Sequence, residues 1–380
     1  MKKLSLAFLS AVSLVALTTG CSSSEVIEEG PALQTGAITF GATNVAKPSR
    51  AEVLGVLNNA NFTEFHVFGC YTTGALANVQ IFSGDVVTKG ASSAWTYTGE
   101  RYWLENATYN FYAYSCGNME EKLSTSELAN PSLVNGILEI QDFTLHANHD
   151  LVFAEVKNVN SNEYAKVENP QPINMEFKHI LTRVKFSFKG EVPDNNYEIS
   201  VSEVNINGLL NEATYNKGGN RRWMDYNDKL SEVALNVAND GKVPCHVGSA
   251  VNATNAATVA CDPIFVIPNQ EYKNDNEEDN VVNLTFKMTI NRKNTVNGTT
   301  ELIPVVQRTV TASWNPDWSQ GKSVNNVITL SFQNATGLNP ITFKAEILPT
   351  DGADDDNDTW VNETGDLAGL NFSSQAVVTE

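Results

Sequence analysis

The chain has 380 residues, which is long enough for two or three domains, and its 42% hydrophobic and 18% charged residues are typical of a folded, soluble body. It contains 25 basic and 44 acidic residues, which gives a formal net charge of -19 at pH 7. Because an acidic surface repels phosphate backbones, this charge argues against nucleic acid as a partner.

The first twenty residues have the form of an export signal. Two lysines precede an apolar run, Leu4 to Leu17, that is too short to span a membrane. The sequence L-T-T-G-C that ends at Cys21 resembles a bacterial lipobox, which implies that Cys21 is diacylated and becomes the mature N-terminus. We therefore predict a lipoprotein signal peptide over residues 1–20 and a lipid anchor at Cys21. The alternative is a plain signal peptide followed by an incidental cysteine.

Residues 21–50 are predicted to form a lipidated tether and then a short propeptide strand. Ser22 stands where retained lipoproteins carry an aspartate, so we expect the cell outer membrane, with the protein exposed on the surface. Three glutamates in residues 22–36 weakly resemble surface-export signals of Bacteroidota lipoproteins, and an ordinary solvated linker explains them equally well. The strand contains Ile38, Phe40 and Val45. A proline-containing turn around Arg50 and Ala51 follows, and such exposed turns are preferred sites of proteolysis.

Strand patterns dominate the first half of the body. Residues 61–71 alternate apolar side chains on both parities, which predicts a strand covered on both faces. Residues 94–116 hold an aromatic cluster whose period-two spacing favours core packing in a central strand over sugar binding. Residues 120–128 are the one plausible short helix, and residues 150–154 are a further strand.

The stretch from Ile173 to Lys189 organises the chain, because its apolar face changes partway along. Apolar residues occupy odd positions up to Phe177 and even positions from Ile180 onward. Side chains on a strand have a period of two, so this change near His179 indicates either a bulge or a strand that passes from one core to another. We favour the second interpretation and place a domain boundary there, with an N-terminal β-sandwich over residues 51–179 and a C-terminal one over 180–335. The alternative is a bulged strand in one large sandwich.

After this domain boundary, called the seam below, short stretches with period-two alternation are separated by turn residues, and helical periodicity is missing. This pattern indicates an all-β sandwich. The stretches lie at 199–206, 264–267, 284–290, 306–314 and 324–332. Residues 336–380 hold two further alternating runs on either side of an acidic loop. Such strands can complete their own sheet or be donated to a neighbouring molecule, so they form a candidate donor segment. Its apolar residues are Ile341, Phe343, Ile347, Leu370, Phe372 and Val378.

The residues that most often carry chemistry give weak signals here. His146 and His149 are three apart, but outside a helix that spacing does not bring two ligands together, so we expect no metal site. The acidic loop over residues 351–358 lacks the glycine and final glutamate of an EF-hand and is interpreted as a solvated linker. No nucleophile elbow, P-loop or dinucleotide fingerprint is present, and we expect neither an enzyme nor a cofactor. A glycoside hydrolase stays open as a third interpretation, because its two carboxylates are placed by the fold and leave little signal in the sequence.

Four cysteines follow the lipobox: Cys70, Cys116, Cys245 and Cys261. An exported protein can form disulfides, and two cysteines fall in each half of the chain, so the two-domain interpretation predicts pairing within the halves. Unpaired buried thiols are nearly as well supported.

Several stretches, taken together and in order, resemble the fimbrillin family of Bacteroidota, whose members are lipoprotein subunits of fimbriae, or type V pili. The stretches are Arg101 to Tyr114, Asp150 to Ala154, Phe177 to Phe188, Phe265 to Gln270 and Trp314 to Lys322. There are two departures from the family pattern: an extra residue at Asn269, and an insertion in the last stretch. They leave open whether the chain is a stalk, anchor or tip subunit.

The resemblance implies two transthyretin-like β-sandwich domains in tandem and a role as a structural subunit that other fimbrial subunits, identical or paralogous, bind. It also implies that an extracellular arginine-specific protease cuts after Arg50. The strand at Ile38, Phe40 and Val45 then leaves, and a donor strand of the next subunit takes its place. The alternative function is a surface glycan-binding lipoprotein with tryptophans as stacking platforms. The tryptophans are Trp95, Trp103, Trp223, Trp314, Trp318 and Trp360.

Overall fold

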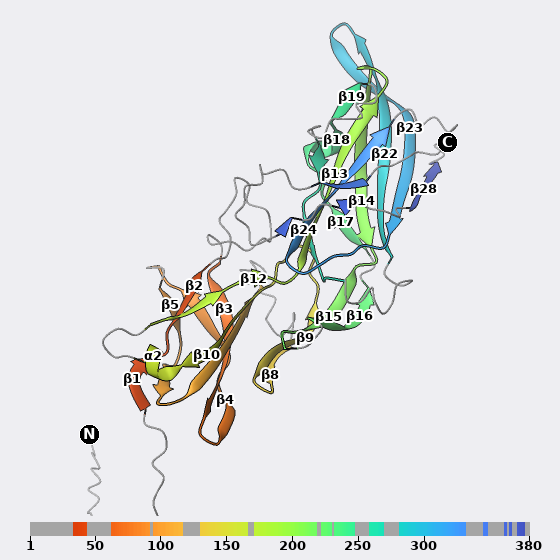
Figure 1. Ribbon diagram of the computed structural model, residues 1–380. Helices are drawn as coiled ribbons and strands as arrows, with labels where there is room; N and C mark the ends of the chain where they lie inside the picture. Colours follow the sequence, from red (N-terminus) through yellow and green to blue (C-terminus); the bar gives the residue numbers. More distant parts are fainter. Residues whose placement is uncertain are drawn as a thin grey trace, which may run out of the picture.

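A computed structural model describes most of the body of the chain, and almost all of what it describes is β-structure, which confirms the all-β prediction (Figure 1). The described ranges are 33–43, 62–91, 94–116, 130–165, 171–218, 222–229, 232–247, 258–269 and 281–331, with the strand residues 345–348, 361–362, 365–366 and 371–376. In these ranges the helical elements are α2 (Ser161–Tyr164) and the short 3-10 helix η1 (Asn239–Gly241). The helix expected over residues 120–128 lies outside them.

A six-stranded sheet forms the first half of the body, in the order β12-β10-β7-β3-β4-β5. Its strands are β3 (Glu64–Thr73), β4 (Leu76–Lys89), β5 (Trp95–Tyr97), β7 (Thr108–Ser115), β10 (Val152–Asn160) and β12 (Lys178–His179). Central strand β7 is buried on both faces, since Tyr109 and Phe111 belong to one hydrophobic cluster and Tyr112 and Tyr114 to another. The aromatic stretch therefore packs in the core, as its spacing predicts.

Two short strand pairs lie beside this sheet. One joins β1 (Leu33–Ala37) to β6 (Tyr102–Leu104), antiparallel, and the other joins β2 (Phe40–Thr43) to β11 (Ile173–Glu176), parallel. Strand pairing in this segment begins before the predicted strand at Ile38, because β1 already starts at Leu33. Its backbone is paired there with β6, a partner that the polar sequence of β1 does not reveal.

A four-stranded sheet connects the two halves in the order β16-β15-β9-β8. The hairpin β8 (Asn130–Val134) and β9 (Ile137–Thr144) comes from the first half, and β15 (Leu210–Asn216) and β16 (Trp223–Lys229) come from the second. Strand β9 pairs antiparallel with β15 across this junction. The halves are thus linked by backbone hydrogen bonds as well as by the covalent chain.

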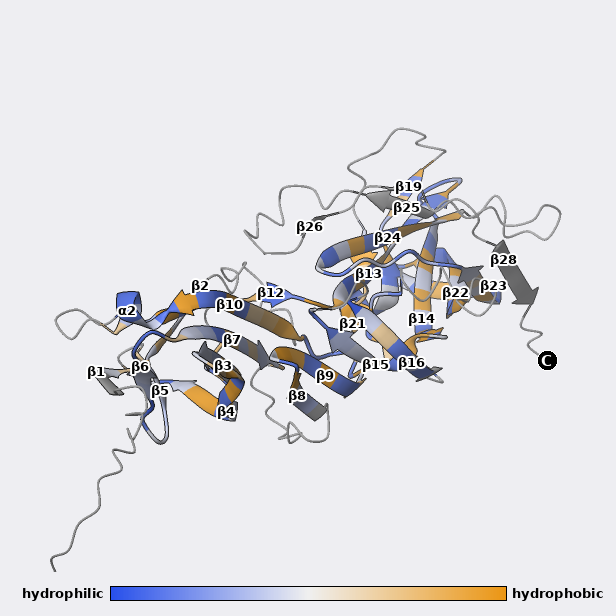
Figure 2. Cartoon of the chain, turned by 60° about the horizontal axis from the view of Figure 1, so that its bottom comes forward, coloured by the Kyte–Doolittle hydropathy of each residue, from blue (hydrophilic) through white to orange (hydrophobic). Residues whose placement is uncertain are grey.

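Two sheets pack face to face in the second half. The first runs β19-β13-β24-β25-β27, with β20, β21 and β26 attached to it, and the second runs β17-β14-β22-β23-β28, with β18 attached. Phe188 of β13 and Phe286 of β22 meet between them, with ring centroids 5.1 Å apart. Figure 2 shows the bands of hydrophilic and hydrophobic residues that this burial imposes along β14.

The strands of these sheets have the following bounds. The first sheet contains β13 (Thr182–Val192), β19 (Cys245–Val247), β20 (Val259–Ala260), β21 (Ile264–Val266), β24 (Lys322–Ser331), β25 (Ala345–Leu348), β26 (Val361–Asn362) and β27 (Gly365–Asp366). The second contains β14 (Tyr197–Asn207), β17 (Val233–Leu235), β18 (Lys242–Val243), β22 (Val282–Val296), β23 (Thr299–Trp314) and β28 (Asn371–Ala376).

The buried residues fall into two clusters, and the change of cluster coincides with the change of face near His179. Ile173, Met175 and Phe177 belong to the smaller cluster, whereas Ile180 and the apolar residues after it belong to the larger one. The larger cluster also takes residues from the first half, so it spans the seam. The domain boundaries at 179/180 and 335/336 and the tandem transthyretin-like arrangement stay predictions.

The four cysteines of the body are free thiols, so the prediction of disulfides within each half is wrong. Cys70 and Cys261 are buried in the strand-packed interior, and burial raises the pKa of both thiols. The alternative of unpaired thiols therefore holds. No helix among the described residues is both long and apolar enough to cross a membrane.

Candidate functional site

Residues 33–43, here called the leader strand, form a strand with a change of partner in its middle. Its first part, β1, runs antiparallel to β6, with Ala37 opposite Tyr102. Its second part, β2, runs parallel to β11, with Phe40 opposite Ile173. The change occurs at Ile38 and Thr39, where the backbone N–H of Ile38 donates to the carbonyl of Arg101 at 2.8 Å. The leader strand is thus hydrogen-bonded to two different strands of the N-terminal half, β6 and β11.

The apolar side chains of the leader strand lie in the hydrophobic core. Ile38 is 0% exposed and Phe40 4% exposed, and both belong to the smaller cluster. The Phe40 ring meets four aromatic rings edge-on, at centroid distances of 5.3 to 6.3 Å. The four rings belong to Phe65, Phe82, Tyr97 and Phe111. The leader strand therefore fills space that the rest of the chain leaves open.

Tyr97 and Arg101 hold the backbone of the leader strand at its midpoint. The Tyr97 hydroxyl donates to the Ile38 carbonyl at 2.7 Å and accepts from the Arg101 N–H at 3.3 Å. The Arg101 guanidinium in turn lies 2.6 Å from Asp85 and 4.8 Å from the centroid of the Phe82 ring. Burial raises the pKa of Tyr97, so its hydroxyl keeps the proton that it donates. Nothing in the local sequence around Tyr97 and Arg101 indicates this role.

The leader strand can do two things for the body, and both are binding functions. It covers an apolar surface, and it pairs with β11, which among the described strands has β2 as its hydrogen-bonded neighbour. The N–H of Ile173, at the start of β11, donates to the carbonyl of Thr39 at 2.8 Å. Without the leader strand, both the apolar surface and the backbone groups of β11 would face water. The leader site, meaning the surface that this strand covers, is therefore a binding site for an extended peptide.

The remaining predicted site residues are only partly described. The lipidation residue Cys21, the cleavage residues Arg50 and Ala51, and Val45 lie outside the described residues, as do Ile341, Phe343, Leu370 and Val378. The acidic loop over residues 351–358 and Trp360 also lie outside them. Ile347 is in β25, which pairs antiparallel with β24, and Phe372 is in β28, which pairs with the edge of β23. The tail strands β25 and β28 thus belong to the sheets of the second half.

The tryptophans do not form a surface for stacking sugars in the part of the chain that the structure describes. Trp103, Trp223, Trp314 and Trp318 are each buried, and Trp95 is half-buried against Phe62 and Phe65. Stacking on a sugar requires an exposed ring face. The five described tryptophans therefore give the glycan-binding alternative no support.

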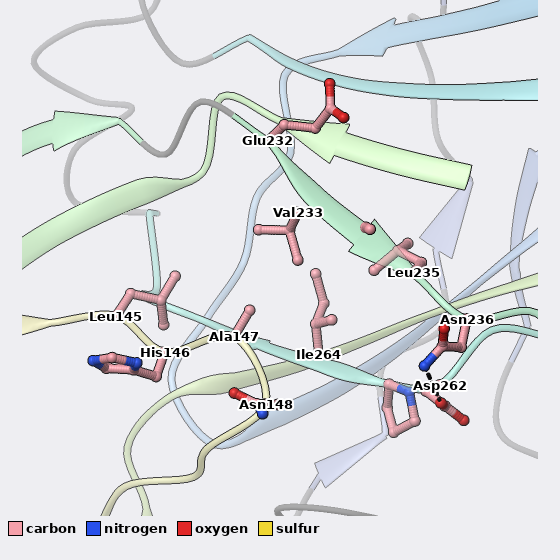
Figure 3. Close-up of a pocket in the computed structure, with 12 residues that line it drawn as sticks. Leu145, His146, Ala147, Asn148, Glu232, Val233, Leu235, Asn236, Asp262 and Ile264 are labelled. Atoms are coloured by element: carbon pink, nitrogen blue, oxygen red, sulfur yellow. Dashed lines mark hydrogen bonds between the residues drawn. The ribbon is translucent and has the colours of Figure 1, made fainter. Parts of the chain in front are cut away.

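A cavity of about 400 Å³ lies between the loop at residues 145–148, β17 and the start of β21 (Figure 3). Its carboxylates, Glu232 and Asp262, stand on opposite sides of it in Figure 3, and Asp262 is hydrogen-bonded to Asn236. His146 is at its edge, with its ring 5.9 Å from that of His149. Over the described ranges, no three histidine, cysteine, aspartate or glutamate side chains gather closely enough to hold a metal ion.

Fold and site together define an all-β protein whose own N-terminal strand completes its hydrophobic core. The chain matches the family model described as fimbrillin-like over residues 49–347 and belongs to that family. The match begins just before Arg50, so the leader strand lies outside it. No curated protein sequence matches the chain.

Two solved structures of similar proteins, both from Bacteroides species, serve for comparison. A fimbrial protein from Bacteroides vulgatus ATCC 8482 is 17% identical, with a TM-score of 0.55, and the match covers 81% of this chain and 98% of that one. This likeness supports the fold. A candidate cell adhesion protein from Bacteroides uniformis ATCC 8492 is 13% identical, with a TM-score of 0.40 and coverage of 82% and 97%. A TM-score this low supports no statement about the present chain.

Proposed function

We propose that this protein is a structural subunit of cell-surface fimbriae that is exported as an outer-membrane lipoprotein precursor. Membership of the fimbrillin-like family supports the fimbrial role and assembly with other fimbrial subunits. In the proposed sequence of events, Cys21 carries the lipid, an arginine-specific protease cuts between Arg50 and Ala51, and the leader strand departs. A donor strand of another subunit then takes over the leader site.

The observation that carries this proposal is the position of the leader strand. It lies entirely on the N-terminal side of Arg50, so a single cut there removes its covalent link to the body. Yet Ile38 and Phe40 are buried in the core of that body. A strand that is part of the core, and that one cut separates from the body, can complete the core until cleavage and leave afterwards. An ordinary solvated tether would bury neither side chain.

After the leader strand departs, a leader site filled by a donor strand has a lower free energy than an empty one. Burying an isoleucine or a phenylalanine side chain contributes roughly 1.5 to 3 kcal/mol each, so loss of both exposes a strongly apolar surface. The backbone edge of β11 opens at the same time. An incoming strand covers the apolar surface and pairs with β11 in one step, which is the physical basis of strand addition. The reaction requires binding only, with no catalytic group of this chain.

Limited proteolysis tests the proposal. Purified precursor treated with an arginine-specific protease should give a product that begins at Ala51 and forms a ladder of oligomers on denaturing gels without boiling. The matched control is Arg50→Lys, which the protease cannot cut at this position. A product that begins at Ala51, has lost residues 33–43 and stays monomeric at high concentration would contradict donor-strand exchange.

Metabolic labelling tests the export part separately. Cells that express the precursor are grown with an alkyne analogue of palmitate, and the label should appear on the precursor in the outer-membrane fraction. The Cys21→Ala variant should carry no label, and cleavage by the protease should separate the label from the chain that begins at Ala51. Label that stays on the chain that begins at Ala51 would contradict the assignment of Cys21.

A further inference from the structure

Five residues of the leader strand recur near the end of the chain. Residues 38–42 read I-T-F-G-A, and residues 341–345 read I-T-F-K-A, so four of the five positions are identical. The tripeptide I-T-F occurs at these two places only in the sequence. The first copy is the part of the leader strand that enters the core, and the second lies in the candidate donor segment.

Three of the repeated positions are those whose side chains, in the leader strand, contact the hydrophobic core. Ile38 and Phe40 are buried, and Ala42 is half-buried against the same cluster. Residues 341, 343 and 345 repeat these three side chains in the same spacing. A strand presents every second side chain to the core, so the second copy has the shape that the leader site already accommodates.

The position that differs is one where a larger side chain fits once a single exposed side chain moves. A Cβ added at Gly41 would lie 2.6 Å from the Oδ1 atom of Asn174, which is the far end of an exposed side chain. Rotation of Asn174 makes room for Lys344 there. Glu176 shares the exposed face of β11 with Asn174, so a lysine at this position gains a carboxylate neighbour.

We propose that residues 341–345 of one molecule bind the leader site of a second copy of this chain, residue for residue in place of residues 38–42. The inference rests on the proposed function and adds to it the donor and its register. Phe343 takes the place of Phe40 among the four aromatic rings that surround it, opposite Ile173. Lys344 lies opposite Asn174. The donor strand runs parallel to β11, as β2 does.

The second alternating run of the tail matches the leader strand less well. With Phe372 aligned on Phe40, residues 370–374 read L-N-F-S-S, which shares only the phenylalanine with residues 38–42. The sequence therefore favours the run at 341–345 over the run at 370–374. Which run binds decides how much of the tail crosses to the next molecule.

The chain length permits this transfer. Nine residues, 332–340, separate the end of β24 at Ser331 from Ile341. At about 3.3 to 3.6 Å per extended residue they reach roughly 30 Å, so β24 keeps its place in its own sheet while the donor leaves. The transfer releases the four residue pairs that hold β25 on β24. Parallel pairing with β11 replaces that antiparallel ladder.

Cysteine cross-linking tests the register. An acceptor carrying Asn174→Cys is mixed with a donor carrying Lys344→Cys, treated with the arginine-specific protease and oxidised mildly. The added-Cβ position at Gly41 shows that side chains at these two sites meet. We expect a disulfide that joins residues 174 and 344 of different molecules, identified by mass spectrometry of the linked peptide, and formed only after cleavage. The matched control donor carries Ser373→Cys, the position that corresponds to Gly41 in the second tail run.

A precursor that carries both Gly41→Cys and Asn174→Cys reports on the acceptor, since it should form the same link within one molecule before cleavage. Ladders without a link from residue 344, or with a link from residue 373 instead, overturn the assigned donor and leave strand exchange standing. If the protease removes residues 33–43 and no ladder forms, the proposed function and the assigned donor both fail.

Discussion

The hydroxyl of Tyr97 donates a 2.7 Å hydrogen bond to the backbone carbonyl of Ile38, at the point where the leader strand changes its partner from β6 to β11. The same hydroxyl accepts from the N–H of Arg101, whose carbonyl accepts from the N–H of Ile38. Tyr97, at the end of β5, and Arg101, just before β6, therefore satisfy both backbone groups of Ile38. This arrangement fixes the leader strand without any covalent bond.

Tyr97→Phe should weaken retention of the cut leader. The substitution removes one hydrogen bond and leaves the Ile38 carbonyl without it, which costs about 1 kcal/mol and speeds release about fivefold. Release is measured as loss of residues 33–43 from the cleaved protein over time. The control is Tyr102→Phe, because the Tyr102 hydroxyl bonds only to the exposed Glu100 side chain among the contacts described. Equal release rates in the two variants would contradict the role of Tyr97.

Phe40→Ala should destabilise the precursor and have no effect on the protein after cleavage. Removal of a buried phenylalanine side chain costs about 3 to 5 kcal/mol, because it leaves a cavity among the four rings that surround it. The free energy of unfolding in urea is compared before and after the cut and removal of the leader. Thr39→Ala serves as control, since Thr39 is exposed. A Phe40→Ala precursor as stable as the Thr39→Ala precursor would contradict the role of Phe40 in the core.

His179 and Asp150 form a buried polar pair at the seam, with 2.6 Å between Nδ1 and Oδ2 and side chains 1% and 0% exposed. His179 is on β12, next to β10, and the carboxylate of Asp150 also accepts from the Leu151 N–H. Removing one partner of a buried polar pair costs about 1 to 3 kcal/mol, because the other group stays buried without it.

Asp150→Asn should therefore lower the free energy of unfolding by about that amount, and so should His179→Gln. The double variant should lose less than the sum of the two, with a coupling of about 1 kcal/mol or more. Urea unfolding of the four proteins measures this. Additive losses would mean that the two side chains act independently at the seam.

Cys261 should resist alkylation while the protein is folded. Burial, followed by the nearby charge of Asp262, raises the pKa of its thiol to about 12, so the reactive thiolate is scarce at neutral pH. Iodoacetamide labelling followed by mass spectrometry should modify Cys261 only after unfolding in urea. Rapid labelling of the folded chain at Cys261 would contradict this burial.

The same shift makes stability depend on pH. The folded chain keeps the Cys261 proton up to a pH of about 12, whereas the unfolded chain releases it near its usual 9.0. The contribution is fully present below pH 9.0 and is lost as the pH rises toward 12, by about 1.4 kcal/mol per pH unit. As the pH rises from 9.0 toward 12, the free energy of unfolding of Cys261→Ala should fall less than that of the parent protein. Identical slopes in urea unfolding at rising pH would contradict the shift.

Sequence alone determined the features that depend on local periodicity. Period-two alternation predicted β14, β22 and the second half of β23, because these stretches present alternate side chains to a buried face. It also predicted β24, whose Val324, Ile328 and Leu330 lie in the larger cluster. The parity change at His179 predicted the change from one hydrophobic cluster to the other. Ile38 and Phe40 stood out as a strand in the N-terminal segment for the same reason.

Only the tertiary structure decided which strands are neighbours. The pairing of β2 with β11 and the Tyr97 bond to Ile38 join residues far apart in sequence, and such partners are selected by the total burial of the fold. Asn269 and Trp318 illustrate this, because Asn269 is the extra residue of one stretch and Trp318 lies in the other stretch, which carries the insertion. In the folded chain they exchange two hydrogen bonds, at 2.8 and 3.1 Å, so one departure stabilises the other.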